Sequence, residues 1–241
     1  MNAALPIANT SISRPNEAGF VGFVMHPKAS HGAMSEFQAL LSGYNRFRTH
    51  GYREERRRWE ELATGQEPPV MIIGCCDSRV DPATIFDTKP GQVFILRNVA
   101  NLVPPFELGG GLHGVSAALE FAVTKLGVKH ILVMGHGMCG GVSACLAGHG
   151  EPDRIFIDKW IGLLDGARDR VVAEAPEDPQ RALEWEGVKV SLANLRTFPF
   201  VAEREAAGAL QLHGGWFSIA EGTLYELDEQ AGEFAPVPDA D

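Results

Sequence analysis

The sequence predicts an α/β fold, a mostly parallel central β-sheet flanked by helices. Three short apolar runs, at residues 70–74, 92–96 and 130–135, have the length and the continuous hydrophobicity of buried strands. An amphipathic segment at 112–126 lies between the last two runs and has the spacing of a helix. Apolar strands that alternate with helices are typical of a parallel sheet.

Two helices are expected before the first strand. From Ser35, apolar residues recur at the spacing of one helical face, at Phe37, Leu40, Leu41, Tyr44 and Phe47. A charged helix is expected over 53–63, where arginines alternate with glutamates and indicate a solvated face rather than a phosphate site. Residues 1–33 have no lasting period and contain three prolines, so we interpret them as an N-terminal arm that wraps a neighbouring surface.

The remainder predicts further helices and a C-terminal β-hairpin. Asp81 followed by Pro82 is a helix-start pattern, a capping residue before a first-turn proline. Polar helices are expected over about 154–174 and 179–196, followed by a strand and a hairpin that turns at Glu221 and Gly222. Because no repeat or linker interrupts this pattern, residues 34–241 are predicted to form a single domain.

Composition restricts the class of partner. The formal net charge is −10 and the pI is about 5.3, which argues against nucleic acid or an anionic membrane as the main partner. No apolar run approaches the roughly 20 residues of a membrane span, and the N-terminus lacks the pattern of a secretory signal. We therefore expect a cytoplasmic protein that binds a small molecule or another protein.

Cysteine and histidine follow two of the expected strands. Cys75 comes directly after the run at 70–74, and His136 and Cys139 come directly after the run at 130–135. Ligands of an open parallel sheet bind at the carboxyl ends of its strands, so these side chains are expected to meet at one rim.

Two thiolates and one imidazole form a zinc ligand set. A structural zinc site needs a fourth cysteine or histidine, and neither remaining cysteine is well placed. Cys76 should point away from Cys75, and Cys145 should lie on the wrong side of a helix that begins near Cys139. Three ligands with an open fourth position are the catalytic pattern, in which zinc lowers the pKa of its water to about 7.

Asp77 and Arg79 have roles beside such a site. Asp77 shares the orientation of Cys75 at period two, so its carboxylate could lie close enough to accept the proton of a zinc-bound hydroxide in a hydrogen bond. Arg79 could hold that carboxylate ionised and fixed in direction. The alternative is that Asp77 only begins a turn and Arg79 lies on the surface; the neighbouring metal ligand favours the functional interpretation.

The combined motif resembles the β-class carbonic anhydrases. "CCDSR", "HGMCGG" about 60 residues later, "LRNVANLVPPFE", "GVSAALEFAV" and "LHGGWFSIAEGTL" are similar to family blocks, over roughly residues 35 to 227. The resemblance implies reversible hydration of carbon dioxide to bicarbonate by zinc-bound hydroxide. It assigns zinc binding to Cys75, His136 and Cys139, and orientation of the hydroxide to Asp77 and Arg79. It also makes Asp77 a fourth zinc ligand in a closed, inactive state.

The resemblance further implies a substrate pocket and self-association. Gln66 matches an active-site glutamine, and Phe94 and Val99 match an apolar carbon dioxide pocket, although both are also plausible core residues. Gly140 is expected to offer its backbone N–H to substrate at a helix start. A dimer that joins sheet edges is implied, with tetramers or octamers in some members.

Two departures and two alternatives remain. Phe121 stands where many members have tyrosine, so that hydroxyl is absent here. Ile72 stands where the bicarbonate-regulated subgroup has tryptophan, so no regulation by a bicarbonate pocket is expected. One alternative is hydrolysis of carbon disulfide or carbonyl sulfide with the same ligands. The other is a structural or regulatory zinc protein without activity.

Overall fold

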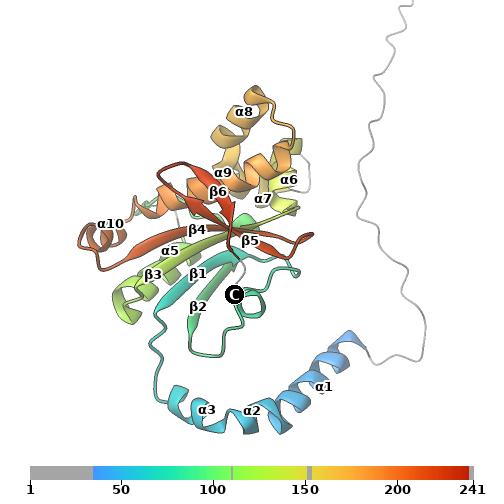
Figure 1. Ribbon diagram of the computed structural model, residues 1–241, viewed down its shortest axis with the longest axis vertical. Helices are drawn as coiled ribbons and strands as arrows, with labels where there is room; N and C mark the ends of the chain where they lie inside the picture. The colour runs from blue at the N-terminus through green and yellow to red at the C-terminus, as the bar shows by residue number, and fades with distance from the viewer. Residues whose placement is uncertain (1–34, 110, 151–153, 239–241) are drawn as a thin grey trace, which may run out of the picture. The chain divides into compact units, whose positions relative to one another are not determined.

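A computed structural model describes residues 35–109, 111–150 and 154–238 (Figure 1). The expected arm at 1–33 lies outside the described residues. The chain divides into two units, 1–56 and 57–241, which are described separately. The boundary that the sequence places between residues 33 and 34 stays a prediction.

The first unit is helical. Helix α1 (Glu36–Thr49) is capped by Ser35, whose hydroxyl accepts from the backbone N–H of Gln38, and α2 (Gly51–Glu54) follows. Within the described part of the chain, neither helix has a buried residue. Phe37 and Leu40 are 65% and 70% exposed, so the apolar face that the sequence predicts has no cover within this unit.

The second unit is built on a six-stranded sheet with the order β2-β1-β3-β4-β5-β6. The parallel strands are β1 (Val70–Cys75), β2 (Val93–Asn98), β3 (His130–His136) and β4 (Gln211–Ser218). An antiparallel hairpin adds β5 (Thr223–Asp228) and β6 (Glu233–Pro236). The mostly parallel sheet and the hairpin turn were expected; the four-residue β6 was not, because it is too short to show a period.

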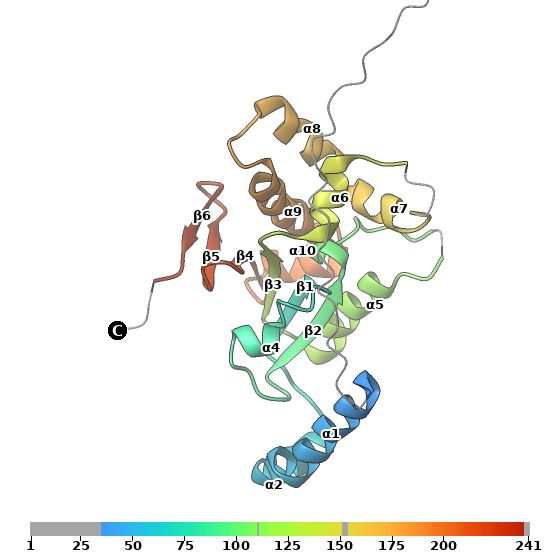
Figure 2. The same cartoon turned by 90° about the vertical axis from the view of Figure 1, so that its right-hand side faces the viewer.

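One face of the sheet packs against helices (Figures 1 and 2). These are α5 (Gly114–Glu120), which continues as a π-helix (η2, Phe121–Leu126), α9 (Pro179–Leu195) and α10 (Pro199–Ala206). The core on this face joins alternate strand residues to helical ones, including Met71, Ile73, Ile131, Val133, Leu119, Val123, Val188, Leu192, Phe198 and Val201. This core fixes the strands whose ends carry the site.

A second core cluster lies at the carboxyl ends of the strands. It combines Cys75 and Cys139 with the short elements that follow β2 and β3. These elements are η1 (Val99–Asn101), α6 (Gly140–Ala147), α7 (Ile157–Ile161), η3 (Gly162–Leu164) and α8 (Asp165–Glu174). The segment expected as one helix over 154–174 therefore comprises three, since Gly162 interrupts it.

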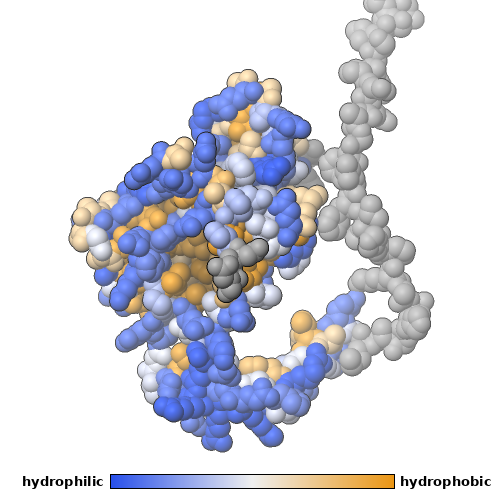
Figure 3. Space-filling view, viewed as in Figure 1, coloured by the Kyte–Doolittle hydropathy of each residue, from blue (hydrophilic) through white to orange (hydrophobic). Residues whose placement is uncertain are grey.

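The opposite sheet face is more open. Helix α3 (Arg56–Leu62) precedes β1, and Pro82 of the short helix α4 (Pro82–Ile85) lies 3.4 Å from the Cβ position of Gly74 on this face. Figure 3 shows an apolar area here, and a pocket of about 280 Å³ is lined by residues that include Val70, Leu132, Leu224 and Val237. No described helix is long and apolar enough to cross a membrane.

Candidate active site

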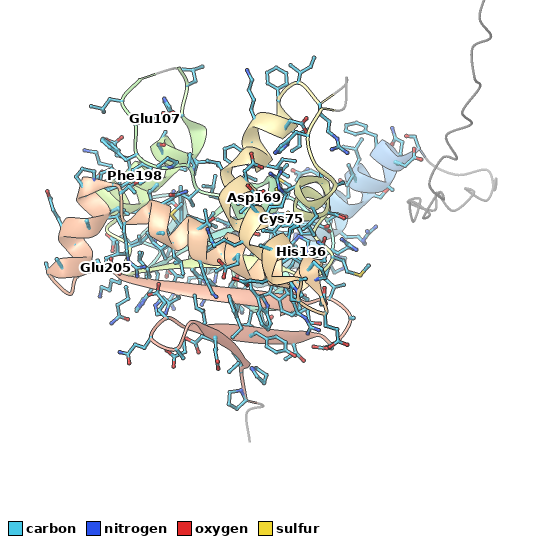
Figure 4. All side chains as sticks on the ribbon, turned by 90° about the horizontal axis from the view of Figure 1, so that it is seen from above. Cys75, Glu107, His136, Asp169, Phe198 and Glu205 are labelled. Carbon is cyan, nitrogen blue, oxygen red and sulfur yellow. The ribbon has the colours of Figure 1, made fainter. Side chains whose placement is uncertain are left out.

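The ends of β1 and β3 bring together three side chains that could hold a metal ion. Strand β1 ends at Cys75 and β3 ends at His136, and the turn at Gly137 and Met138 places Cys139 at the start of α6. Met138 has φ 56°, a left-handed conformation that costs a non-glycine residue about 1 kcal/mol. The sulfur atoms of the two cysteines are 4.0 Å apart, and the three ligand atoms lie within 4.8 Å of one another. Figure 4 shows Cys75 and His136 side by side at this end of the sheet.

The imidazole of His136 is oriented for metal binding. Its Nδ1 lies 2.9 Å from the carbonyl oxygen of Gly137, and because a carbonyl only accepts, Nδ1 carries the proton. The lone pair is then on Nε2, which is buried and finds no hydrogen-bond partner among the described residues. An unpaired buried nitrogen that faces two thiols is a donor arrangement suited to a metal ion. Tetrahedral zinc with bonds of about 2.3 Å separates two sulfurs by about 3.8 Å, so the donor set fits that ion.

The two thiols have opposite shifts in pKa. The thiol of Cys139 donates to Cys75, and this hydrogen bond is the main cause that lowers the pKa of Cys75 to about 4. The backbone N–H groups of Asp77 and Ala100 also point at Cys75 Sγ, at 3.5 and 3.3 Å. The pKa of Cys139 is raised by its bond to Cys75 and by burial. The pair therefore holds one negative charge and shares one proton. A bound divalent cation would displace that proton and leave two thiolates.

The loop after β2 supplies the N–H of Ala100, which sequence reasoning did not identify. Ala100 and Asn101 both have positive φ, 60° and 49°. Asn98 holds this conformation, because its side chain accepts from the N–H of Leu102 and donates to the carbonyl of the same residue, each at 2.9 Å. The signal was present in "RNVANL", where an asparagine can replace backbone partners in a turn.

Asp77 and Arg79 form a two-point ion pair beside the three ligands. Arg79 Nε lies 2.9 Å from Asp77 Oδ1, and Nη2 lies 2.7 Å from Oδ2. The backbone N–H of Arg79 adds a third bond to Oδ1 at 3.0 Å. The arginine holds the pKa of the Asp77 carboxyl well below its usual range, so the carboxylate is ionised at neutral pH.

Arg97 fixes the loop that carries this pair. Its guanidinium donates to the carbonyl oxygens of Cys75 and Asp77 at 2.8 and 2.7 Å, and to the carboxylate of Asp81 at 3.3 Å. The side chain of Arg97 thus bonds carbonyl groups at the end of β1 and in the segment after it. The sequence could not assign these acceptors, because they depend on how the loop folds over β2.

The four expected substrate residues separate into two groups. Val99 and Gly140 lie at the carboxyl rim: Val99 directly follows β2, whose last residue pairs with Cys75, and Gly140 begins α6. Phe94 pairs with Met71, so it lies about 13 Å along the sheet from Cys75, and it packs on the helix-covered face. Gln66 precedes β1, at the opposite end from Cys75. Within one chain, therefore, only Val99 and Gly140 lie at the same end of the sheet as Cys75.

An apolar pocket adjoins Val99. Its volume is about 590 Å³, and it is lined by Asn98, Val99, Phe156, Ile157, Lys159 and Trp160. The indole N–H of Trp160 donates to the carbonyl of Val99 at 2.8 Å and thereby positions the wall. Phe156 is 85% exposed, so the pocket opens to the surface. An apolar recess of this kind suits a small uncharged molecule.

Behind the ligands lies a buried acid that sequence reasoning missed. Glu184 of α9 is 3% exposed and accepts hydrogen bonds from the backbone N–H of Cys139, from Gln180 and from Trp216. Burial raises the pKa of Glu184, and these three hydrogen bonds oppose the rise. No residue pattern along α9 distinguishes Glu184 from Glu186, the half-buried acid two residues later.

The chain is similar to a known protein family over most of its second unit. The family model described as "Carbonic anhydrase" matches residues 70–224, which include the four parallel strands and the start of β5. The curated protein beta carbonic anhydrase 3 of Arabidopsis thaliana is 36% identical over 200 residues, which cover 79% of this chain and 77% of the relative.

Solved structures have the same fold. The β-carbonic anhydrase CcaA superposes with a TM-score of 0.80 at 30% identity, over 86% of this chain and 94% of that one. A structure described as one of two tetrameric β-carbonic anhydrases from Sordaria macrospora has a TM-score of 0.72 at 29% identity, over 85% of this chain and 100% of the other.

Proposed function

Because the chain belongs to the β-class carbonic anhydrases, which hydrate carbon dioxide reversibly to bicarbonate, we propose that Cys75, His136 and Cys139 bind its catalytic zinc ion. The observation that carries this assignment is the buried, unpaired Nε2 of His136 facing two sulfurs 4.0 Å apart. When bound, zinc supplies a Lewis acid that makes hydroxide available near neutral pH. Three protein ligands leave one position for water or substrate.

Asp77 and Arg79 are proposed to orient the attacking water. The carboxylate of Asp77 is ionised and only accepts, so it can take a hydrogen bond from water and hold its proton away from the incoming carbon dioxide. Arg79 keeps this carboxylate turned toward itself, which favours the open arrangement over the one in which Asp77 becomes a fourth zinc ligand. Ile72 in place of the tryptophan of the regulated subgroup supports a site that is open at neutral pH.

Val99 and Gly140 are proposed to bind substrate at the rim of the same chain. The pocket beside Val99 offers carbon dioxide an apolar surface, and the exposed N–H at the start of α6 is free of intrahelical partners. Gln66 and Phe94 cannot reach this rim within one chain. Their proposed contacts with substrate therefore require a second copy.

Self-association is supported by the surface of each unit. The structure from Sordaria macrospora is described as tetrameric, which indicates that relatives self-associate. Here β2 forms one edge of the sheet, the open sheet face carries an apolar area, and α1 exposes Phe37, Leu40, Leu41 and Tyr44. We propose a dimer, with larger assemblies built from it, in the cytoplasm, as composition suggests.

The test is metal content measured together with stopped-flow hydration of carbon dioxide. One zinc per chain and a rate well above buffer would support the proposal. One zinc per chain without hydration would favour the structural zinc protein instead. Release of sulfide from carbon disulfide, faster than hydration of carbon dioxide, would favour the alternative hydrolase.

A further inference from the structure

The backbone of Cys139 is held from behind by helix α9. Glu184 Oε1 accepts from the N–H of Cys139 at 2.9 Å, and Gln180 Nε2 donates to the carbonyl oxygen of Cys139 at 3.1 Å. Gln180 Nε2 also donates to Glu184 Oε1 at 2.7 Å, and the two residues are one helical turn apart. Both backbone polar groups of Cys139 are thus bonded to side chains that are neighbours on a single helix.

Glu184 does not line the apolar pocket beside Val99. Its second oxygen, Oε2, accepts from the indole N–H of Trp216 at 3.0 Å, and the side chain of Trp216 packs over the backbone of Gly137 in the same turn. All three donors point at two carboxylate oxygens, so its hydrogen-bonding capacity is used for structure. A buried acid is costly to keep unless its partners are fixed in this way.

The turn that needs this support is strained. Met138 has φ 56° and is 71% exposed, so its side chain does not anchor the turn in the core. On its outer side, the carbonyl of Met138 accepts from Arg79 Nη2 at 3.1 Å. On its inner side, the N–H of Cys139 depends on Glu184, because Cys139 is the N-cap of α6 and its amide has no intrahelical acceptor.

We propose that Glu184 and Gln180 are positioning residues that clamp the backbone of Cys139 and thereby hold its sulfur at the separation a zinc ion requires. The proposal rests on the proposed zinc site and adds the two residues that preorganise it. A ligand held in place loses less conformational freedom when the metal binds, so the clamp increases zinc affinity.

The substitution Glu184→Gln tests the clamp with almost no change in volume. A glutamine offers one carbonyl oxygen and one NH₂ group, so its NH₂ must face either the indole N–H of Trp216 or the donors at Oε1. Zinc affinity, measured by competition with a chromogenic chelator, is expected to fall about 10- to 100-fold. The cobalt-substituted protein should show weakened thiolate-to-cobalt charge-transfer bands. Glu186→Gln is the matched control, because Glu186 lies on the same helix but pairs with Arg170 and Lys189.

A Trp216→Phe variant distinguishes loss of hydrogen bonds to Glu184 from a general loss of stability. Trp216→Phe removes the donor at Oε2, so Glu184→Gln should cost less zinc affinity in that background than in the wild type. Gln180→Leu, on the first turn of α9, should fold readily and weaken zinc binding about threefold to tenfold. Urea unfolding of the metal-free proteins shows whether a variant is simply less stable.

Equal zinc affinity of Glu184→Gln and Glu186→Gln would overturn the clamp. So would equal losses of unfolding free energy with and without zinc, because a merely structural acid would produce that result. If Glu184→Gln does not fold, a zinc affinity of Gln180→Leu equal to that of the wild type would overturn the clamp. Wild-type protein that binds no zinc contradicts the proposed zinc site, which is a different result from any of these.

Discussion

Arg79 connects the loop of Asp77 to the turn at Met138, and these two segments follow the proposed zinc ligands Cys75 and His136. Its guanidinium donates to both carboxylate oxygens of Asp77, and the same Nη2 donates to the carbonyl of Met138, at 3.1 Å. The loop after β1 and the turn before Cys139 are therefore joined through one planar side chain. This geometry uses the fork of arginine, which lysine lacks.

Arg79→Lys keeps the positive charge but cannot make the two-point contact. We expect kcat/KM for hydration to fall about 10- to 100-fold, since a shift of about 1 Å in an orienting group has an effect of that size. Zinc content should stay at the wild-type level. Stopped-flow kinetics and metal analysis of the same samples check both statements, and unchanged kcat/KM would contradict an orienting role.

The adjacent cysteines should behave differently. Cys75 is buried within the ligand group, whereas Cys76 is exposed and its backbone N–H pairs with Asn98. Cys75→Ser should lose zinc and activity, and Cys76→Ser should keep both. Metal analysis after dialysis provides the measurement. The reverse result would show that the register assigned to β1 is wrong, and with it the role of Asp77.

Two neighbouring glycines form a matched pair. A Cβ at Gly141 would lie 2.7 Å from Val99 Cγ1 and 3.1 Å from the Cβ of Ala100, whereas at Gly140 no described atom lies within 4 Å. Gly141→Ala should therefore destabilise the fold by about 1–3 kcal/mol and reduce activity, because it displaces the loop that bonds Cys75. Gly140→Ala keeps its backbone N–H and should be tolerated. Chemical denaturation and hydration assays of both variants distinguish them; equal effects would be inconsistent with the packing described.

One ion pair away from the site should give a pH-dependent stability. Arg196 donates to Glu229 through two bonds of 2.8 Å, and this contact lowers the pKa of Glu229. A lowered pKa contributes stability above the unfolded value, about 4.3, and this contribution is lost as pH falls through the folded value.

Glu229→Gln should therefore be less stable than wild type at pH 7. Because both partners are partly exposed, the difference should be about 0.5–1 kcal/mol, and it should shrink as the pH falls below about 5. Urea unfolding at several pH values measures it, with the exposed Glu233→Gln as control. A difference that grows in acid would have the wrong sign.

The apolar face of α1 should mediate self-association. Leu40→Glu places a charge on that face without altering the sheet, since Leu40 is 70% exposed. We expect sedimentation velocity to show a shift toward smaller species, while Val172→Glu, at a site 60% exposed on α8, should leave the assembly unchanged. An unaltered distribution for Leu40→Glu would mean that another surface joins the subunits.

Much of the fold could be predicted from the hydrophobic period of the sequence and the length of its apolar runs. The strands at 70–74, 92–96 and 130–135 are observed as β1, β2 and β3, because buried strands in parallel sheets are continuous apolar runs. Helix α10 and strand β6 were missed, because each is short and its burial depends on contacts with distant segments. The helix expected over 112–126 exists but ends as a π-helix from Phe121, a change of hydrogen bonding that no sequence period shows.

The sequence alone determined which chemistry the chain carries. Residue types and their place after two strands were sufficient to nominate Cys75, His136 and Cys139, because parallel strands end at one rim. Tertiary structure decided the rest. The separation of the sulfurs, the N–H of Ala100 at Cys75 and the hydrogen bond of Glu184 to Cys139 arise from segments up to 64 residues apart, brought together only when loops and α9 pack. Hydrogen bonds depend on distances and directions in space, and periodicity along a chain specifies neither.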